Sequence, residues 1–182
     1  MISKDIRRYM TLMEGQNGIE GYHASLSKVT TFDINKIDDA SLGFHFAETP
    51  ELAINAAIKA GKRNPVVAKY FLDIKNPLRI TGQPNGFSAF KVLDDMMKHG
   101  QLSDDLYNTF MDRYDDIEEG GVFDIALEVN AMMRDLLGTL GNDGFEYMNT
   151  FDAGLNIQGT GTDVQAGLSW IVLSPRQIRL IG

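Results

Sequence analysis

The chain has 182 residues, of which 43% are hydrophobic, so it can form one domain with its own core but not two large ones. Its 25 acidic and 17 basic residues give a formal charge of −8, which argues against a nucleic-acid surface built on a clustered positive field. The absence of cysteine excludes disulfides, thiolate nucleophiles and zinc sites with thiolate ligands. We therefore expect a single domain over residues 1–182.

The same sequence features bear on where the protein acts. There is no run of about 18 apolar residues that could cross a membrane. The first residues lack the apolar stretch and small-residue cleavage site of a signal peptide. A chain without cysteine also suits a reducing compartment. We expect a cytoplasmic protein without a membrane partner.

The first part of the chain predicts short strands connected to helices. Residues 1–14 carry apolar side chains at helical spacing, which predicts an amphipathic N-terminal helix. A first strand is predicted at 19–25, and a polar connection over 26–42 leads to a second strand at 43–48. A helix is predicted to follow directly over 50–60.

The rest of the chain predicts a group of helices followed by more strands. Apolar residues recur at helical spacing from about 87 to 140, which predicts a helical insertion, and its acidic stretch 104–119 fits a solvated helix face. The Gly/Asn/Thr-rich segment 150–167 predicts a loop. Further strands are predicted where β-branched and aromatic residues are concentrated: 66–74, 78–80, 144–149, 168–173 and 177–181. Strands at both ends with helices between them favour an α+β domain.

The strand predicted at 43–48 places a histidine between two phenylalanines. Side chains in a strand alternate between faces, so Phe44 and Phe46 share one face and His45 lies on the other. Thr49 can cap the free N–H groups of the next helix, and Pro50 suits its first position. His45 is therefore a candidate functional residue at the end of a strand, before a firmly seated helix.

His23 has a similar position on the first predicted strand, next to the small Ala24. His23 and His45 are two of only three histidines, and each stands alone on a short strand, which makes them a candidate pair. His99 lies in a Lys-His-Gly helix end, where a cation complements the helix dipole. We expect no metal site, because no third ligand has suitable spacing and thiolates are absent.

Motifs of common hydrolases and nucleotide-binding loops are missing. The sequence has no G-x-S-x-G elbow, no H-E-x-x-H helix and no Walker loop. Gly159–Thr162 is rich in glycine but falls within a predicted loop, not between a strand and a helix, which argues against a phosphate cradle. This loop is better interpreted as a cover or a segment that contacts a partner.

Five segments, in chain order, match short motifs of one family. They are Tyr22-His23-Ala24-Ser25 ([FY]-H-[GA]-[ST]), Phe32–Ile37 (F-D-x-x-K-I), Gly43–Ala53 (G-x-[YH]-F-[ATG]-[DET]-x-x-E-x-A), Phe71–Leu78 ([YF]-L-x-I-K-N-P-L) and Trp170–Ile178 ([YW]-[IV]-V-[FL]-x-P-x-Q-I). Together they resemble the ADP-ribosyltransferase fold family, which includes diphtheria toxin, the poly(ADP-ribose) polymerases and many small bacterial and phage proteins. The resemblance implies a split antiparallel β-sheet core and does not cover the helical insertion at 87–140.

The resemblance also implies roles for individual residues towards NAD. In the family, the first-strand histidine binds the adenosine ribose, and the next two residues hold the nicotinamide amide; here these are His23, Ala24 and Ser25. The second-strand position, often a tyrosine that packs on the nicotinamide ring, is His45 here, and Phe46 beside it is also expected to contact NAD. An imidazole can exchange hydrogen bonds with a ribose hydroxyl, and a flat ring can stack.

One position departs from the best-known members of the family. These members carry a glutamate just before the last core strand, which stabilises the cationic transition state as nicotinamide leaves. The matching residue here is Ser169, which can bind a ribose hydroxyl but supplies no charge. Asp152 is the nearest carboxylate that the loop can bring in, and Asp163 is a second candidate. We expect His45, Ser169 and Asp152 to carry catalysis.

The resemblance implies a mono-ADP-ribosyltransferase that uses NAD as substrate and modifies a protein target, as a bacterial or phage effector against a host or defence component. The loop 150–167 is a hypothesis for the segment that selects the target. A second hypothesis is a non-catalytic domain of this fold that binds NAD or a protein, because Ser169 is uncharged. RNA 2′-phosphotransferases of the same fold use two histidines, but the acidic composition and Leu26, Ser27 and Lys28 argue against their basic RNA surface.

Overall fold

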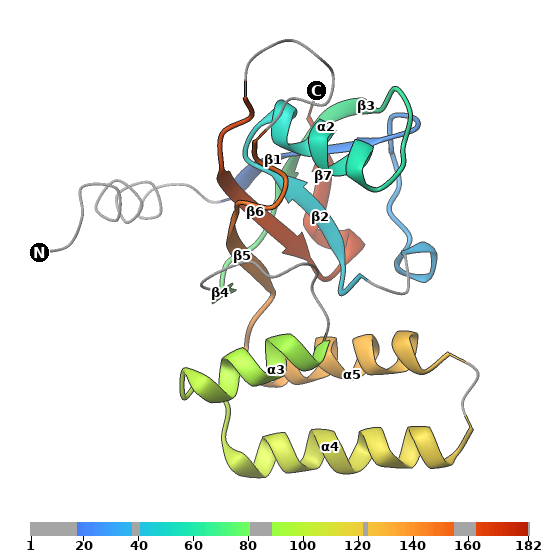
Figure 1. Ribbon diagram of the computed structural model, residues 1–182, viewed down its shortest axis with the longest axis vertical. Helices are drawn as coiled ribbons and strands as arrows, with labels where there is room; N and C mark the ends of the chain where they lie inside the picture. Colours follow the sequence, from blue (N-terminus) through green and yellow to red (C-terminus); the bar gives the residue numbers. More distant parts are fainter. Residues whose placement is uncertain (1–17, 38–40, 81–88, 122–123, 155–162, 182) are drawn as a thin grey trace, which may run out of the picture.

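The computed structural model describes residues 18–37, 41–80, 89–121, 124–154 and 163–181 (Figure 1). The predicted N-terminal helix and the Gly159–Thr162 segment lie outside the described residues. Within them, the chain forms a mixed β-sheet with helices, so the predicted α+β class is confirmed. None of the helices in the described ranges combines the length and the hydropathy needed to cross a bilayer.

Seven strands of the described residues form one sheet. Their bounds are β1 (Ile19–Ser25), β2 (Phe44–Ala47), β3 (Val66–Leu72), β4 (Pro77–Ile80), β5 (Gly144–Asn149), β6 (Gly167–Val172) and β7 (Ile178–Leu180). The order across the sheet is β4-β5-β6-β2-β1-β3-β7. All neighbours are antiparallel except β4 and β5, which are parallel because the intervening helices return the chain to the same end of the sheet. The sheet is therefore mixed, with one parallel pair, where the resemblance implied a split antiparallel core.

The two faces of the sheet bury different sets of side chains. One face buries a cluster of aromatic and aliphatic side chains that includes Phe46, Tyr70 and Trp170. Phe32, from the connection between β1 and β2, packs against this cluster. This connection contains a short 3₁₀ helix, η1 (Ile34–Lys36), and a second one, η2 (Pro175–Gln177), precedes β7. The alternation predicted for β2 is confirmed, because Phe44 and Phe46 are both buried in this cluster while His45 is exposed.

Helix α2 (Pro50–Lys59) lies against the opposite face of β1 and β2. It begins as predicted, with Pro50 in its first turn and the Thr49 hydroxyl accepting a hydrogen bond from the Leu52 N–H at 3.3 Å. Its buried side chains, Leu52 and Ala53 among them, contact Ala24 and Ala47 of the sheet. Small residues at this contact let the helix lie close to the strands that carry His23 and His45.

The helical insertion forms three helices, α3 (Ala89–Lys98), α4 (Asp104–Glu119) and α5 (Ile125–Thr139). In Figure 1 they lie beyond the β4 and β5 end of the sheet, with α4 the outermost. Among the described positions of α4, Phe110 is the one buried residue. The acidic side chains of α4 are exposed, which confirms the predicted solvated face.

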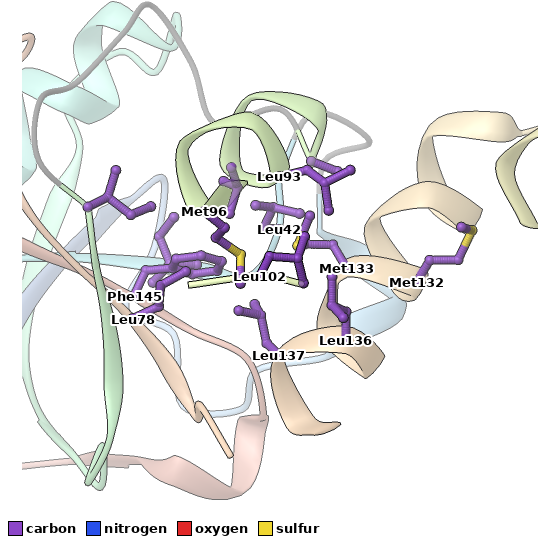
Figure 2. Close-up of a cluster of buried hydrophobic side chains, with 14 of the residues drawn as sticks. Leu42, Leu78, Leu93, Met96, Leu102, Met132, Met133, Leu136, Leu137 and Phe145 are labelled. Carbon is purple, nitrogen blue, oxygen red and sulfur yellow. The ribbon is translucent and has the colours of Figure 1, made fainter. Parts of the chain in front are cut away.

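The helices and the sheet share one apolar core. Figure 2 shows Leu42, from the residues just before β2, among Leu93 of α3 and Met133 of α5. Phe145 and Leu78 extend this cluster from the sheet. The insertion is therefore packed into the domain through the segment that leads into β2.

The importance of this core can be measured with two leucines of α5. Leu137 is fully buried and Leu127 is 39% exposed. Leu137→Ala should lower the free energy of unfolding by about 2–5 kcal/mol, because it leaves a cavity among close-packed side chains. Leu127→Ala is the matched control and should cost less than about 1 kcal/mol. Urea denaturation checks both, and equal losses would contradict a core at this place.

Candidate functional site

The candidate site lies where β1 and β2 meet. These strands share one registered residue pair in the described structure, Tyr22 with Ala47, whereas β1 and β3 pair along the whole of β1. Beside this pair, Nδ1 of His23 lies 2.9 Å from the main-chain oxygen of His45. A carbonyl oxygen can only accept, so His23 donates its Nδ1–H. The structure thus brings the two histidines into direct contact, through the ring of one and the main chain of the other.

The two rings do not face each other. Tyr22 stands opposite Ala47, so alternation places His23 on the face of Phe46 and His45 on the face of Ala47. The ring of His23 is surrounded by Phe32 at 5.5 Å and Phe46 at 5.6 Å between ring centroids. The two predicted histidines therefore lie close together where β1 and β2 meet, with one ring on each face of the sheet.

His23 is held as a neutral ring with a defined tautomer. Burial among aromatic side chains lowers its pKa, the hydrogen bond to the His45 oxygen works in the opposite direction, and the charge of Lys62 lowers the pKa further. Since Nδ1 carries the proton that His23 donates, Nε2 of the neutral ring is a hydrogen-bond acceptor. This atom can accept a hydrogen bond from a hydroxyl of a ligand.

The ring of His45 is oriented by the residues that precede β2. Its Nε2 lies 3.0 Å from Oγ of Ser41, and this hydroxyl donates to the main-chain oxygen of Gly43 at 2.6 Å. Because the hydroxyl proton is used in that bond, Nε2–H of His45 is the donor to Ser41. Desolvation, then the neighbouring His23 and Lys62, lowers the pKa of His45. The side chain of His45 is exposed to solvent, so the decrease in its pKa is smaller than complete burial would cause.

Lys62 is a cation at this site that the sequence pattern did not indicate. It follows α2, and its Nζ donates to the main-chain oxygen of Ala24 at 3.4 Å. Its charge lowers the pKa of both His23 and His45. Lys62 therefore places a positive charge near both histidines in a chain of formal charge −8, which favours a negatively charged ligand group at this point.

Ser169 lies in the interior, on the same face of the sheet as His45. It stands opposite Ala47 on β2 and Tyr147 on β5, and is 1% exposed. Its hydroxyl accepts a hydrogen bond from Nδ2 of Asn149 at 3.1 Å. Burial and the negative charge of Asp152 raise the pKa of the Tyr147 phenol, which Ser169 contacts by a hydrogen bond, so Tyr147 stays protonated.

Asp152 is brought to Ser169 by the same asparagine. Nδ2 of Asn149 donates to Oδ2 of Asp152 at 2.8 Å, and Oδ1 of Asn149 accepts the main-chain N–H of Asp152 at 3.0 Å. Asp152 is 8% exposed, and Nζ of Lys59 lies 4.0 Å from its Oδ1. Asn55 of α2 donates to its main-chain oxygen at 3.1 Å. The predicted loop carboxylate therefore reaches Ser169 through a single shared side chain.

The other predicted residues have less direct positions. Ala24 is buried under α2, and Ser25 donates its hydroxyl to the main-chain oxygen of Ser27 at 2.5 Å. Phe46 is 2% exposed, so its side chain supports His23 within the core and its predicted contact with NAD stays a prediction. Asp163 is exposed, and the structure shows no bond from it to Ser169. No cluster of three or more potential metal ligands occurs among the residues that the structure describes.

Comparison of the chain with known proteins gives no match, whether to family models, to curated proteins or to solved structures. The site must therefore be interpreted from its own geometry and from the resemblance of the five short segments.

The sequence pattern missed the polar side chains that hold the site together. Asn55 and Asn149, which are 1% and 2% exposed, contact Asp152, and Ser41 and Lys62 contact His45 and Ala24. Asn55 gave a signal that could have been used, because an asparagine on the apolar side of a helix needs a partner. Ser41 and Lys62 lie in connections, where the spacing of residues does not indicate which way a side chain points.

The lowered histidine pKa values predict how stability depends on pH. The unfolded chain binds protons more readily than the folded one, so stability is complete above the ordinary pKa of 6.5 and falls as the pH drops below it. Urea denaturation from about pH 8 to pH 5 should show this decrease. His23→Gln, which can still donate to the His45 oxygen, should reduce the slope. Identical slopes for wild type and His23→Gln would contradict the assignment.

Proposed function

We propose that the protein is an NAD-dependent mono-ADP-ribosyltransferase that modifies a protein target. The observation that carries the proposal is the placement of the residues named by the resemblance. His23, His45 and Ser169 lie on the three adjacent strands β1, β2 and β6, and a buried carboxylate, Asp152, is held beside Ser169. The ADP-ribosyltransferase-like architecture of the sheet is part of this proposal.

The two histidines would bind different parts of NAD, which would have to reach both faces of the sheet where β1 and β2 share the Tyr22–Ala47 pair. Nε2 of the neutral His23 would accept a hydrogen bond from a ribose hydroxyl, since its other nitrogen is already engaged with the His45 oxygen. The exposed ring of His45 would stack on the nicotinamide ring, with its orientation fixed by Ser41. Lys62 would attract the negatively charged diphosphate to this edge of the site.

The carboxylate of Asp152 would act on the reacting ribose. In the transfer, the bond between C1′ of this ribose and the nicotinamide nitrogen breaks, and nicotinamide leaves with the electron pair. A nucleophilic side chain of the target then forms the new bond to C1′ and loses a proton. Positive charge develops on the ribose between these events. A fixed carboxylate therefore stabilises the transition state more than it stabilises the ground state. Ser169, which is 1% exposed, would support this carboxylate through the shared Asn149 side chain.

A second function is favoured by one specific observation. Asp152 already contacts Asn149 and Lys59, and the residue beyond Asn149 in this network is the uncharged Ser169. A domain that binds NAD, or a protein partner, without catalysis would show the same arrangement. Binding without turnover is therefore the alternative that the experiments must separate from transfer.

The first test is transfer of label from NAD to protein. Purified protein is incubated with NAD labelled in its adenylate part and with bacterial cell extract, and nicotinamide release is measured in parallel. Wild type should label a protein, and His23→Ala and His45→Ala should each reduce labelling by about 10-fold or more. Absence of both label and nicotinamide release from wild type would refute the transferase. Thermal stabilisation by NAD would in that case support the binding domain.

The second test identifies the carboxylate. Asp152→Asn should lower kcat by about 100-fold with little change in KM, because the charge matters mainly in the transition state. Asp163→Asn provides the comparison, as the other carboxylate of the same loop. A large loss with Asp163→Asn and none with Asp152→Asn would show that the carboxylate is assigned to the wrong residue.

A further inference from the structure

The helical unit, α3 to α5, contacts the segment that orients His45. Asn130 of α5 donates from Nδ2 to the main-chain oxygen of Ser41 at 3.4 Å, and Nη1 of Arg134 lies 3.5 Å from the main-chain oxygen of Leu42. Asn130 is 6% exposed, although asparagine is costly to bury without a hydrogen-bond partner. Two side chains, one turn apart on α5, therefore contact two successive carbonyls, those of Ser41 and Leu42, in the segment that leads into β2.

Leu42 anchors the same segment by packing. Its side chain is fully buried, and Figure 2 shows it among Leu93 of α3 and Met133 of α5. Its neighbour Ser41 contacts Nε2 of His45, and the oxygen of His45 accepts from His23. A continuous series of contacts thus connects α5 to both histidines.

We infer that the helical unit positions the ring of His45, with Asn130 and Ser41 as positioning residues. A shift of α5 would move the Ser41 hydroxyl and weaken its hydrogen bond to Nε2 of His45, which would change the orientation of the ring. A molecule that binds the helical unit and shifts α5 would therefore alter the site. The consequence for catalysis rests on the proposed function, whereas the positioning itself does not.

The positioning is tested without any substrate. The protein has three histidines, so selective ¹⁵N labelling of histidine gives few ring signals to assign. The Nε2 proton of His45 should be protected from exchange in wild type and in Ser41→Thr, which keeps the hydroxyl. Ser41→Ala, Asn130→Ala and Arg134→Met should each speed its exchange by about 10-fold, the loss expected for one hydrogen bond.

Glu128→Ala is the matched control, because Glu128 is an exposed residue of the same helix. It should leave the exchange rate of the His45 proton unchanged. Arg134→Met keeps the test valid if Asn130→Ala does not fold, since Arg134 is only half-buried. Folded Asn130→Ala and Arg134→Met proteins with a wild-type exchange rate would overturn the inference, as would an unprotected Nε2 proton in wild type.

Activity gives the second readout. If the transferase is active, Asn130→Ala should lower kcat/KM for NAD by about 10-fold in the wild-type background and have no effect in a His45→Ala background. Equal effects in both backgrounds would show that Asn130 acts on stability or on another residue, which contradicts positioning. A changed exchange rate with no transfer activity in wild type would refute the proposed function and leave the positioning intact.

Discussion

The bond from the His23 ring to the main-chain oxygen of His45 is the interaction on which the candidate site depends. It joins β1 to β2 beside the registered pair of Tyr22 and Ala47, and it fixes which nitrogen of His23 carries the proton. Aromatic neighbours partly shield the ring from water, which lowers its pKa and favours the neutral form. A positively charged His23 would lose its acceptor atom. Burial favours the neutral ring and outweighs the hydrogen bond to the His45 oxygen, which alone would raise the pKa of His23.

A second constraint is the complete pairing of buried polar groups. Asn149 uses both its amide donor and its oxygen to connect Ser169, the Asp152 carboxylate and the Asp152 main chain. In the described ranges, no fully buried side-chain nitrogen or oxygen lacks a partner. Such a network fixes one arrangement of its members, because removing any of them leaves another polar group unpaired in the interior.

Much of the fold could be predicted from local patterns, and the site only in part. Alternation at Phe44, His45 and Phe46 and the Thr49 cap were sufficient to place β2 and α2. The order of strands was not predictable, because pairing joins residues far apart and leaves no periodic signal. For the same reason the sequence identified His23, His45 and Asp152 as candidates but not the contacts that Asn149 and Ser41 make with them.

The parallel pairing of β4 with β5 has a consequence for how the chain assembles. The contact between Arg79 and Glu146 on these strands joins residues 67 positions apart, and all three helices lie between them. During synthesis, β4 must leave the ribosome well before its partner strand exists, and the chain must close a long loop to pair them. Completion of the sheet is therefore a late event, and we expect refolding slower than that of helical proteins of this length.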